Sequence, residues 1–530
     1  MDEAWQTIEF LLYTMLKWIL TNHRQLCLLF ELTFLLDVPA IGISNGVDAF
    51  PLHKKVILAK NEIKGRNILS QAMINDGNTV YVIRYDFDLN NSEIVIPDNS
   101  VIEIKGGSLN YGTLVLSSNI RIKGNGCVCK LAHKGLSHKN FIRAVGVENI
   151  EFDDICIEGG YDNSGNIDPW KKFGDAENPI FIKDSSTIRF KHVGIAKFAN
   201  DNKGPKSSTW DKDDKKYGFA AIKLYNCKDI VFDSCYERYS AGEAWEWTLC
   251  RNVTVSDLSM IRTYGVSSIN VQACDNFVLK RSEFINDNCQ GNIVNFTASN
   301  SRFSDNKVEV KFTDKELSSN GLIDFGNEFV NRRKNYYSEF VVQHNIFENN
   351  ILRNSGFYNA SEWQGTKIVN IMDIAFTNNK IFKDVSLGVP LQVVHLGHYQ
   401  GVEDITINDN YVEFVNYPKE NTYKRYQLIV AWTGKSEWDT YKGHEFHVKH
   451  LVITGNVIVD YSFSMNYIKY SDTFMKGPYG VVVLRNASDV IISNNKFLNV
   501  FCPIYSTIKD KAHNNVKGNT FTSHIDSVVY

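Results

Sequence analysis

Proline and an excess of basic charge are the two features that this sequence lacks most clearly. It contains only 10 prolines in 530 residues, which excludes long proline-rich linkers or stalks. Its 57 basic and 60 acidic residues give a net charge of −3, whereas a nucleic-acid-binding surface needs a basic excess. Its 10 cysteines include no C-x-x-C pair, the spacing typical of structural zinc sites. We therefore expect no nucleic-acid partner and no zinc centre.

Long apolar runs are also scarce. The run Leu26–Leu36 is shorter than the roughly 20 apolar residues that span a bilayer, so we predict no integral membrane span. Basic residues such as Arg24 precede the run and small residues such as Ala40 follow it, the order typical of a secretory signal. We interpret residues 1–40 as a signal or as an N-terminal helical segment that caps the next domain. A misassigned start codon is a third explanation.

A short repeat is abundant: an apolar anchor, alternating residues and then a polar pair. The repeat occurs about thirteen times. An up-and-down barrel would not require such a repeat. Its shortest spacings, such as Ile230 to Val253, are about 24 residues, as expected for a coil of three strands. The anchors are Ile120, Ile150, Ile188, Ile230, Val253, Phe277, Ser301, Phe340, Ile374, Ile405, Leu451, Val490 and Asn514.

This repeat predicts an all-β fold, a parallel β-helix. It should cover residues 94–530 with about 13 rungs, behind an N-terminal entry or cap region at 41–93. Where the spacing exceeds the minimum, we expect loop insertions that cluster at one corner, between the second and third strands of a rung. The insertions are Gly159–Asn178, Phe198–Tyr217, Lys311–Tyr336, Asn350–Thr366 and Tyr461–Gly477.

Two side-chain ladders support this register. Asparagine recurs five residues after many anchors, where it tolerates a left-handed turn and can bond to adjacent rungs. These asparagines are Asn125, Asn306, Asn345, Asn379, Asn410, Asn456, Asn495 and Asn519. Cys227, Cys250 and Cys274 lie three residues before successive anchors, so their thiols should stack about 4.8 Å apart. We interpret them as buried free thiols; a disulfide along the ladder is the alternative.

A family resemblance accompanies this repeat. The lead-in GRNILSQAMINDGNTVYVIRYDFDLNN and the following IPDNSVIEIKGGSLNYGTL, together with the rungs, resemble the pectin-lyase-like right-handed parallel β-helix superfamily. They are similar to the opening of β-helix proteins from gut Bacteroidetes and their phages. The resemblance implies a right-handed coil and an activity among polysaccharide lyases, glycoside hydrolases and phage tail spikes. It assigns no catalytic residue, because the paired aspartates and Gly-His-Gly of polygalacturonases have no match here.

The third strand of each rung is the expected binding face, since inserted loops wall it. Side chains alternate across a strand, and the expected inward pairs are apolar, as in Ile222/Leu224 and Trp245/Trp247. The expected outward residues are Arg143, Phe181, Lys223, Glu246, Asn270, Val294, Lys183, Tyr225, Thr248 and Gln272.

Lys223, Glu246 and Asn270 form the most secure polar patch, because no insertion separates their rungs. For β-elimination of a uronic acid, Lys223 is the candidate base and Arg143 the candidate carboxylate clamp or acid. Glu246 with Asn270 could hold substrate or a calcium ion. For hydrolysis, which needs two carboxylates, Glu246 would act with Glu243 or Asp287. Alternatively, Lys223 and Glu246 form only a cross-strand pair on a solvated sheet.

Aromatic and polar residues near this patch complete the expected site. The candidate substrate-binding residues are Asn270, Tyr225, Gln272, Glu243, Trp210 and Trp170. We predict an extracellular, cell-surface, periplasmic or virion-associated protein, monomeric or homotrimeric, that binds and cleaves a polysaccharide. A lyase is preferred over a glycoside hydrolase because the secure patch is not a carboxylate pair. A non-catalytic adhesin or tail-spike-like receptor binder is the alternative.

Overall fold

The computed structural model describes most of the chain from residue 54 onward. The described residues are 54–130, 140–159, 179–198, 220–240, 245–262, 267–287, 291–311, 321–326, 340–359, 371–387, 392–397, 402–416, 427–432, 448–460, 480–484, 487–500, 502–506, 515–523 and 528–529. Within them, no helix is both long enough and apolar enough to cross a membrane.

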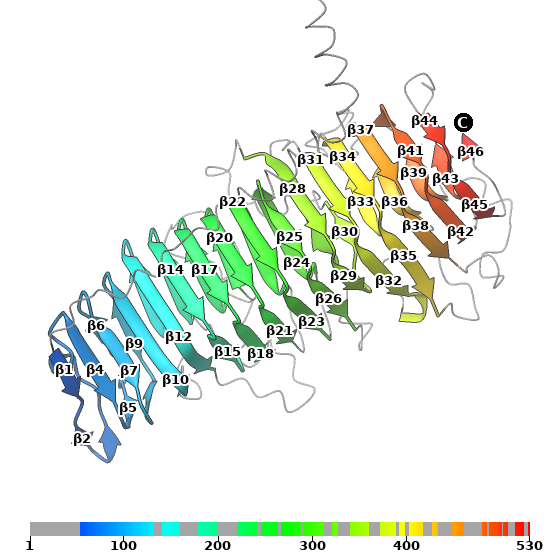
Figure 1. Ribbon diagram of the computed structural model, residues 1–530. Helices are drawn as coiled ribbons and strands as arrows, with labels where there is room; N and C mark the ends of the chain where they lie inside the picture. The colour runs from blue at the N-terminus through cyan, green and yellow to red at the C-terminus, as the bar shows by residue number, and fades with distance from the viewer. Residues whose placement is uncertain are drawn as a thin grey trace, which may run out of the picture. The chain divides into compact units, whose positions relative to one another are not determined.

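One rung illustrates the architecture. β17 (Lys228–Asp233), β18 (Tyr236–Ser240) and β19 (Trp245–Thr248) follow one another along the chain, and none of them pairs with another of the three. Each pairs in parallel with its equivalent one rung later, β20 (Arg251–Ser256), β21 (Ser259–Arg262) and β22 (Ile269–Lys280) respectively. Repetition of this pattern produces three parallel sheets whose strands lie side by side in sequence order (Figure 1). The chain is therefore a parallel β-helix, as predicted.

The first sheet contains the anchors. Its strands are β1 (Lys54–Ile57), β4 (Thr79–Ile83), β7 (Val101–Ile104), β10 (Ile120–Lys130), β12 (Glu148–Glu158), β14 (Ser186–Lys191), β17, β20, the end of β22, β25 (Arg302–Ser304), β28 (Val342–Glu348), β31 (Ile371–Thr377), β34 (Val402–Asn408), β37 (Val448–Thr454), β40 (Ala487–Ser488), β41 (Ile491–Ser493) and β44 (Asn515–Lys517). The stack thus extends upstream of Ile94, since β4 pairs with both β1 and β7.

The second sheet continues from the ends of β10 and β12. Its other strands are β15 (Gly194–Ala196), β18, β21, β23 (Glu283–Asn286), β26 (Lys307–Val310), β29 (Ile351–Arg353), β32 (Lys380–Asp384), β35 (Tyr411–Val415), β38 (Val457–Asp460), β42 (Lys496–Val500) and β45 (Thr520–Ser523). Smaller elements lie outside the three sheets: β2 (Glu62–Ile63) with β3 (Arg66–Asn67), β5 (Asp86–Asp88) with β8 (Ser108–Asn110), and the 3-10 turns η1 (Gln71–Met73) and η4 (Val385–Leu387).

The third sheet is the expected binding face. Its strands are β6 (Glu93–Ile96), β9 (Thr113–Leu116), β11 (Ile142–Val145), β13 (Ile180–Lys183), β16 (Ile222–Tyr225), β19, the start of β22, β24 (Val294–Ser299), β27 (Ile323–Asp324), β30 (Phe357–Tyr358), β33 (Val394–Gly397), β36 (Gln427–Trp432), β39 (Gly480–Leu484), β43 (Ile504–Ser506) and β46 (Val528–Val529).

Inward side chains of all three sheets form one apolar core. Phe190 stacks between Phe152 and Phe232, with ring centroids 4.8 and 4.3 Å apart, because equivalent positions on successive rungs lie one strand spacing apart. Trp245 and Trp247 are fully buried, which confirms the predicted inward pair on β19. Burial of such large rings dominates the energetics of a core of this kind.

The cysteine stack is also confirmed. Cys227, Cys250 and Cys274 are buried, and all three are free thiols. Cys250 Sγ lies 3.5 Å from the carbonyl oxygen of Leu224, and Cys274 Sγ lies 3.4 Å from that of Trp247. Burial raises the pKa of the Cys250 thiol well above its usual value, so this thiol packs as a small apolar group.

The anchor register is correct except at one rung. Ile150 pairs with both Ile120 and Ile188, and Val253 with both Ile230 and Phe277, as predicted. The predicted anchor Phe340 is wrong, because Arg302 pairs with Ile346 and the true equivalent of Ser301 is therefore Asn345. Because the segment before β28 is long, the predicted anchor could lie five residues too early and still fall on an apolar residue, Phe340.

The asparagine ladder runs through the C-terminal rungs. Each member accepts a hydrogen bond from the preceding member of the ladder (from Ser282 in the case of Asn306) and donates one to a carbonyl oxygen one rung back. Its members are Asn306, Asn350, Asn379, Asn410, Asn456, Asn495 and Asn519. Asn350 occupies the place predicted for Asn345, which instead bonds to Ser301 N and to the Ala298 carbonyl. Asn125 bonds to the Ile104 carbonyl in the N-terminal part.

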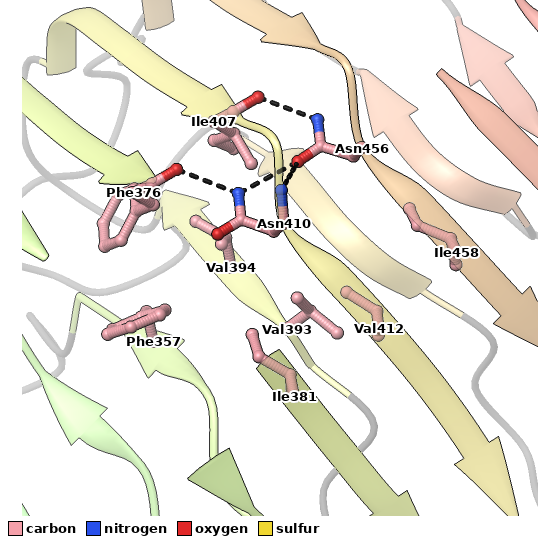
Figure 2. Close-up of a pocket in the computed structure, with 10 residues that line it drawn as sticks. All are labelled: Phe357, Phe376, Ile381, Val393, Val394, Ile407, Asn410, Val412, Asn456 and Ile458. Carbon is pink, nitrogen blue, oxygen red and sulfur yellow. Dashed lines mark hydrogen bonds between the residues drawn. The ribbon is translucent and has the colours of Figure 1, made fainter. Parts of the chain in front are cut away.

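Replacing Asn410 with alanine should test this ladder. Asn410 is buried and accepts from Asn379 N at 2.9 Å. It donates to the Phe376 carbonyl oxygen, also at 2.9 Å (Figure 2). The substitution leaves two buried backbone groups without these partners, which should cost about 2–4 kcal/mol of unfolding free energy. Denaturant unfolding measures the loss. Asn408→Ala, two residues away and half-buried, is the matched control and should cost less than half as much.

The cavity beneath this ladder is a packing defect and not a ligand site. Figure 2 shows its lining: apolar core side chains such as Phe357, Phe376 and Val394, with Asn410 and Asn456 at one side. Its volume is about 10 Å³, enough for one water molecule at most. A sugar ring therefore cannot enter the solenoid here, and any ligand must bind outside.

The segments between described strands fall at two corners of the rung. Residues 160–178 and 199–219 connect the second sheet to the third, whereas 327–339 and 433–447 connect the third sheet back to the first. The prediction of insertions at one corner holds before β24 and only in part after it: Tyr461–Gly477 lies between β38 of the second sheet and β39 of the third, as predicted, whereas 327–339 and 433–447 do not. Lys311–Tyr336 contains β27, and Asn350–Thr366 contains β29 and β30, strands too short to show an alternating pattern.

A buried lysine should make stability depend on pH. Lys383 on β32 shares the inward face with Ile381, and burial lowers its pKa from 10.5 to about 7. In the unfolded chain Lys383 binds a proton below pH 10.5, whereas the folded chain does so only below about 7. Its contribution to stability is therefore present above pH 10.5 and is lost as the pH falls toward 7.

Between about pH 7 and pH 10.5, each increase of one pH unit should add at most about 1.4 kcal/mol to the unfolding free energy. Unfolding curves measured across the window should show this rise in the wild type. Lys383→Met should abolish it, and Lys380→Met, an exposed lysine on the same strand, should retain it. An unchanged slope in Lys383→Met would contradict the assignment.

Candidate functional site

One outward column of the third sheet holds the polar residues of the candidate site. It runs through consecutive paired positions on nine strands, and its central part is polar. The members are Arg143, Phe181, Lys223, Glu246, Asn270, Asn295, Asp324, Tyr358 and His395. Because the strands are parallel and in register, neighbouring members lie about 4.8 Å apart along the solenoid.

Lys223 and Glu246 are brought together as predicted. Lys223 Nζ donates to Glu246 Oε1 at 2.7 Å, and Thr248 Oγ1 donates to the same oxygen at 2.7 Å. The two charged side chains are only 0% and 3% exposed. The cross-strand pair that the sequence offered as the alternative to catalysis is therefore present, but the sheet face around it is not solvated. A buried charge pair of this kind costs desolvation, which the ion pair and the hydroxyl offset.

An amide network continues the column past Glu246. Asn295 Nδ2 donates to Asn270 Oδ1 at 2.6 Å and to Ser267 Oγ at 2.9 Å. Asn292 connects Asn295 to Asp324, with Nδ2 at 3.1 Å from Asn295 Oδ1 and 3.4 Å from Asp324 Oδ2. All five side chains are buried. This network fixes Asp324 at the end of a line of amides.

Tyr358 and His395 extend the column beyond Asp324. Their rings lie with centroids 5.2 Å apart on the adjacent strands β30 and β33. His395 is 6% exposed, while Tyr358 is half-buried and is thus the more accessible of the two. Asp324, Tyr358 and His395 occupy three consecutive positions, which places a carboxyl, a phenol and an imidazole on one line.

Arg143 is not brought to the lysine. Phe181 lies between them in the column, since it pairs with Arg143 on one side and with Lys223 on the other. Arg143 instead binds Glu93 with both nitrogens, Nη1–Oε1 at 2.9 Å and Nη2–Oε2 at 2.7 Å. To bind the carboxylate of a substrate held at Lys223, the Arg143 guanidinium would have to reach past Phe181.

Two other predicted binding residues, Tyr225 and Gln272, lie two residues further along their strands than Lys223 and Asn270. Tyr225 is half-buried, and Lys183 Nζ lies 5.6 Å from its ring centroid. Gln272 is buried and lies beside Thr248, with Thr248 Oγ1 at 3.4 Å from Gln272 Oε1. Glu243, Trp210 and Trp170 lie outside the described residues. Asp287, the other carboxylate proposed for hydrolysis, lies 3.2 Å from Lys311 Nζ beyond the end of β23 in the second sheet.

The outward assignment of Val294 is wrong. Val294 pairs with Ile269 and is fully buried in the core, so Asn295 occupies the outward position beside Asn270. The cause is a shorter corner after β24: Val294 lies seven residues before the anchor Ser301, whereas Ile269 lies eight before Phe277, so the register shifts by one residue between Gln272 and Cys274. A bulge of one residue reverses the face of every side chain beyond it.

Metal binding stays a prediction for this face. Among the residues that the structure describes, no group of three or more His, Cys, Asp or Glu side chains could hold a metal ion. Glu246 and Asn270, the predicted calcium ligands, lie on adjacent strands, but Glu246 Oε1 already accepts two hydrogen bonds. Calcium at Glu246 would have to compete with Lys223 for this oxygen.

Sequence reasoning did not assign Asp324, Tyr358 and His395 to the site. Asp324 and Tyr358 lie on two-residue strands inside segments taken as insertions, and His395 follows another irregular segment. The available signal was local: each is the polar or amphipathic residue that directly follows a core residue, Ile323, Phe357 or Val394.

Known proteins resemble this chain in structure only. No protein-family model matches the chain, and a search of curated proteins finds no relative. Among solved structures, the chain is similar to an exopolygalacturonase from Thermotoga maritima, with 10% identity over 64% of this chain and 80% of that one, at a TM-score of 0.36. The Dettilon tailspike matches with 12% identity over 82% and 63%, at 0.41. A surface adhesin of Streptococcus pneumoniae matches with 10% identity over 87% and 86%, at 0.36.

These solved structures are all right-handed parallel β-helix proteins. At such low identity they speak to the fold alone, and the strand pairing of this chain establishes that fold by itself. The chain is a right-handed parallel β-helix, as the sequence predicts.

Proposed function

We propose that this protein binds a uronic-acid polysaccharide along the outer face of the third sheet and cleaves it by β-elimination. The observation that supports this most directly is the adjacency of Tyr358 and His395, with ring centroids 5.2 Å apart next to Asp324. A phenol and an imidazole are the acid and base types that proton abstraction next to a carboxylate requires. Imidazole has an unperturbed pKa of about 6.5, so this pair needs no desolvated lysine as its base.

The reaction divides between the two groups. His395 takes the proton from C5 of the uronic acid, and the electrons of that C–H bond form a double bond between C4 and C5. The bond from C4 to the glycosidic oxygen breaks, and Tyr358 donates a proton to the departing oxygen. Asn295 is the amide nearest to Asp324, and because its Nδ2 donates to Asn270 and Ser267, the substrate's carboxylate would have to replace one of these acceptors to bind it.

Elimination is favoured over hydrolysis by the positions of the carboxyl groups. Glu246 and Asp324 are the acidic members of the described column, and Asn270 and Asn295 lie between them. Three strand spacings put them about 14 Å apart. Glycoside hydrolases hold their two carboxyl groups roughly 5–9.5 Å apart, so these two cannot flank one bond.

Lys223 is the rival base. Its predicted role, with Glu246 and Arg143 in support, stays a proposal for a second centre on the same face. The ion pair with Glu246 and complete burial oppose this role, because a substrate would have to displace a carboxylate that lies 2.7 Å from Nζ. Variants at both centres distinguish them, as the Discussion sets out.

Binding without cleavage is the second candidate function. The burial of the column from Lys223 to Asp324 favours it, because polar groups that satisfy one another stabilise a face without reacting. In that case the protein is an adhesin or a tail-spike-like receptor binder, and light scattering should show a homotrimer. Either function requires glycan access, so we place the protein outside the cytoplasm, secreted, on a cell or virion surface or in a periplasm.

A polysaccharide screen tests the proposal. Purified protein is incubated with a panel of uronic-acid polysaccharides, with and without calcium, while the ultraviolet absorbance of unsaturated products and the reducing ends are both followed. Both signals should rise together for at least one substrate. Reducing ends without absorbance would establish hydrolysis and overturn elimination. Binding by affinity electrophoresis with neither signal would establish the adhesin.

A further inference from the structure

The end of β10 that belongs to the second sheet holds two cysteines in contact. Cys127 and Cys129 lie two residues apart on the same face of the strand, with Sγ atoms 3.8 Å apart. Cys129 is completely buried in the core, whereas Cys127 is half-buried at its edge. We propose that Cys127 and Cys129 are a redox-active dithiol, which low-molecular-weight disulfides oxidise to an intrastrand disulfide.

The backbone permits this bond. Two residues of extended strand advance about 6.6 Å, which lies within the Cα separation of 4.4–6.8 Å that disulfides span. The sulfur atoms need to approach by less than 2 Å from their present contact. The register also shifts immediately before Cys127, where Asn125 and Gly126 have positive φ values of 50° and 76°. Such a bulge can absorb a small rotation without breaking the strand pairing that follows.

The two thiols have different roles in the oxidation because Cys127 is more exposed than Cys129. The hydrogen bond between the two thiols lowers the pKa of Cys127, while that same bond and burial raise the pKa of Cys129. Cys127 thiolate attacks one sulfur of the oxidant, whose S–S bond breaks and releases the first thiolate. Cys129 then attacks Cys127 Sγ in the mixed disulfide, gives up its proton and releases the second thiolate. Two protein thiols and one disulfide thus become one protein disulfide and two free thiols.

Other described cysteines lack this combination. Cys227, Cys250 and Cys274 are buried and contact backbone carbonyl groups. Cys156 is half-buried on the next strand, but it pairs with Val128, which faces out of the core, and burial raises its pKa. Cys156 is therefore a control within the same protein: its thiol lies one strand away, on the opposite face of the sheet.

Oxidised glutathione is the probe for the full-length protein. After treatment, alkylation, unfolding and trypsin digestion, the peptide between Lys123 and Lys130 should carry an internal disulfide and escape alkylation. Cys129→Ser should stop at glutathione bound to Cys127, and Cys127→Ser should leave Cys129 unmodified. Cys156→Ser should close the disulfide as the wild type does.

Three results would overturn the proposal. They are full alkylation of the wild-type peptide, a mixed disulfide that persists in the wild type, and a bond between Cys127 and Cys156. Far-ultraviolet circular dichroism of each variant confirms that it is folded before its reactivity is compared. The readout is chemical and does not depend on the polysaccharide substrate, so it is independent of the proposed function.

Discussion

Replacing His395 with glutamine is expected to lower the rate of polysaccharide cleavage by about 10²–10⁴-fold, the usual contribution of a general base. Tyr358→Phe should lower it by a similar factor, because the phenyl ring keeps its contact with His395 but carries no proton for the leaving oxygen. Both variants should retain affinity for the polysaccharide, since neither removes the amide line between Asn270 and Asp324. The cleavage rate and the affinity are measured on the same substrate.

Matched controls make these two variants informative. His344→Gln changes an exposed histidine on β28 that lies 2.5 Å from Asp373, and Tyr411→Phe changes a half-buried tyrosine on the second sheet. Both controls should cleave at the wild-type rate. Thermal unfolding of each variant separates a lost proton transfer from a lost fold, because His395 is buried. Wild-type rates in both His395→Gln and Tyr358→Phe would remove this centre from the mechanism.

The sequence predicts this fold well where rungs have no insertions. From Ile230 to Phe277 the spacing is minimal, and the anchor register, the cysteine stack and the inward tryptophans are all confirmed there. In that stretch, a slip of one residue would turn Trp245 and Trp247 out of the apolar core and put Glu246 into it, so the hydrophobic pattern leaves no second register. The same argument fails at Phe340, because a long segment before β28 lets a wrong apolar residue satisfy the pattern.

The candidate site is harder to predict because it depends on features with no sequence period. The corner after β24 is one residue shorter than the corner of the preceding rung, which puts Asn295 at the outward position expected for Val294. β27 and β30 have two residues each, too few for alternation to distinguish them from loop. Burial is the third such feature: the sequence places Lys223 on an outer face, where alternation alone implies solvent, yet its side chain is fully buried.

The buried pair of Lys223 and Glu246 carries the second large prediction. Lys223→Met leaves a carboxylate in a buried site without its ammonium partner, and Glu246→Leu leaves the ammonium without its carboxylate. Removing one partner of a buried ion pair typically costs about 3–5 kcal/mol, and we expect this loss of unfolding free energy in each single variant. Trp245 and Trp247 lie on either side of Glu246 on β19, so two of the nine tryptophans that contribute to the fluorescence signal of unfolding lie at this rung.

The double variant Lys223→Met/Glu246→Leu should unfold within about 1 kcal/mol of the wild type, because apolar side chains of similar volume need no desolvated charge. Its stability makes it a test of mechanism as well. If the pair is structural, the double variant cleaves polysaccharide at the wild-type rate while His395→Gln does not. If Lys223 is the base, the double variant is folded and inactive, and the His395 centre is the one that fails. A double variant as unstable as the two single variants combined would show that Lys223 and Glu246 act independently, contrary to the 2.7 Å contact between them.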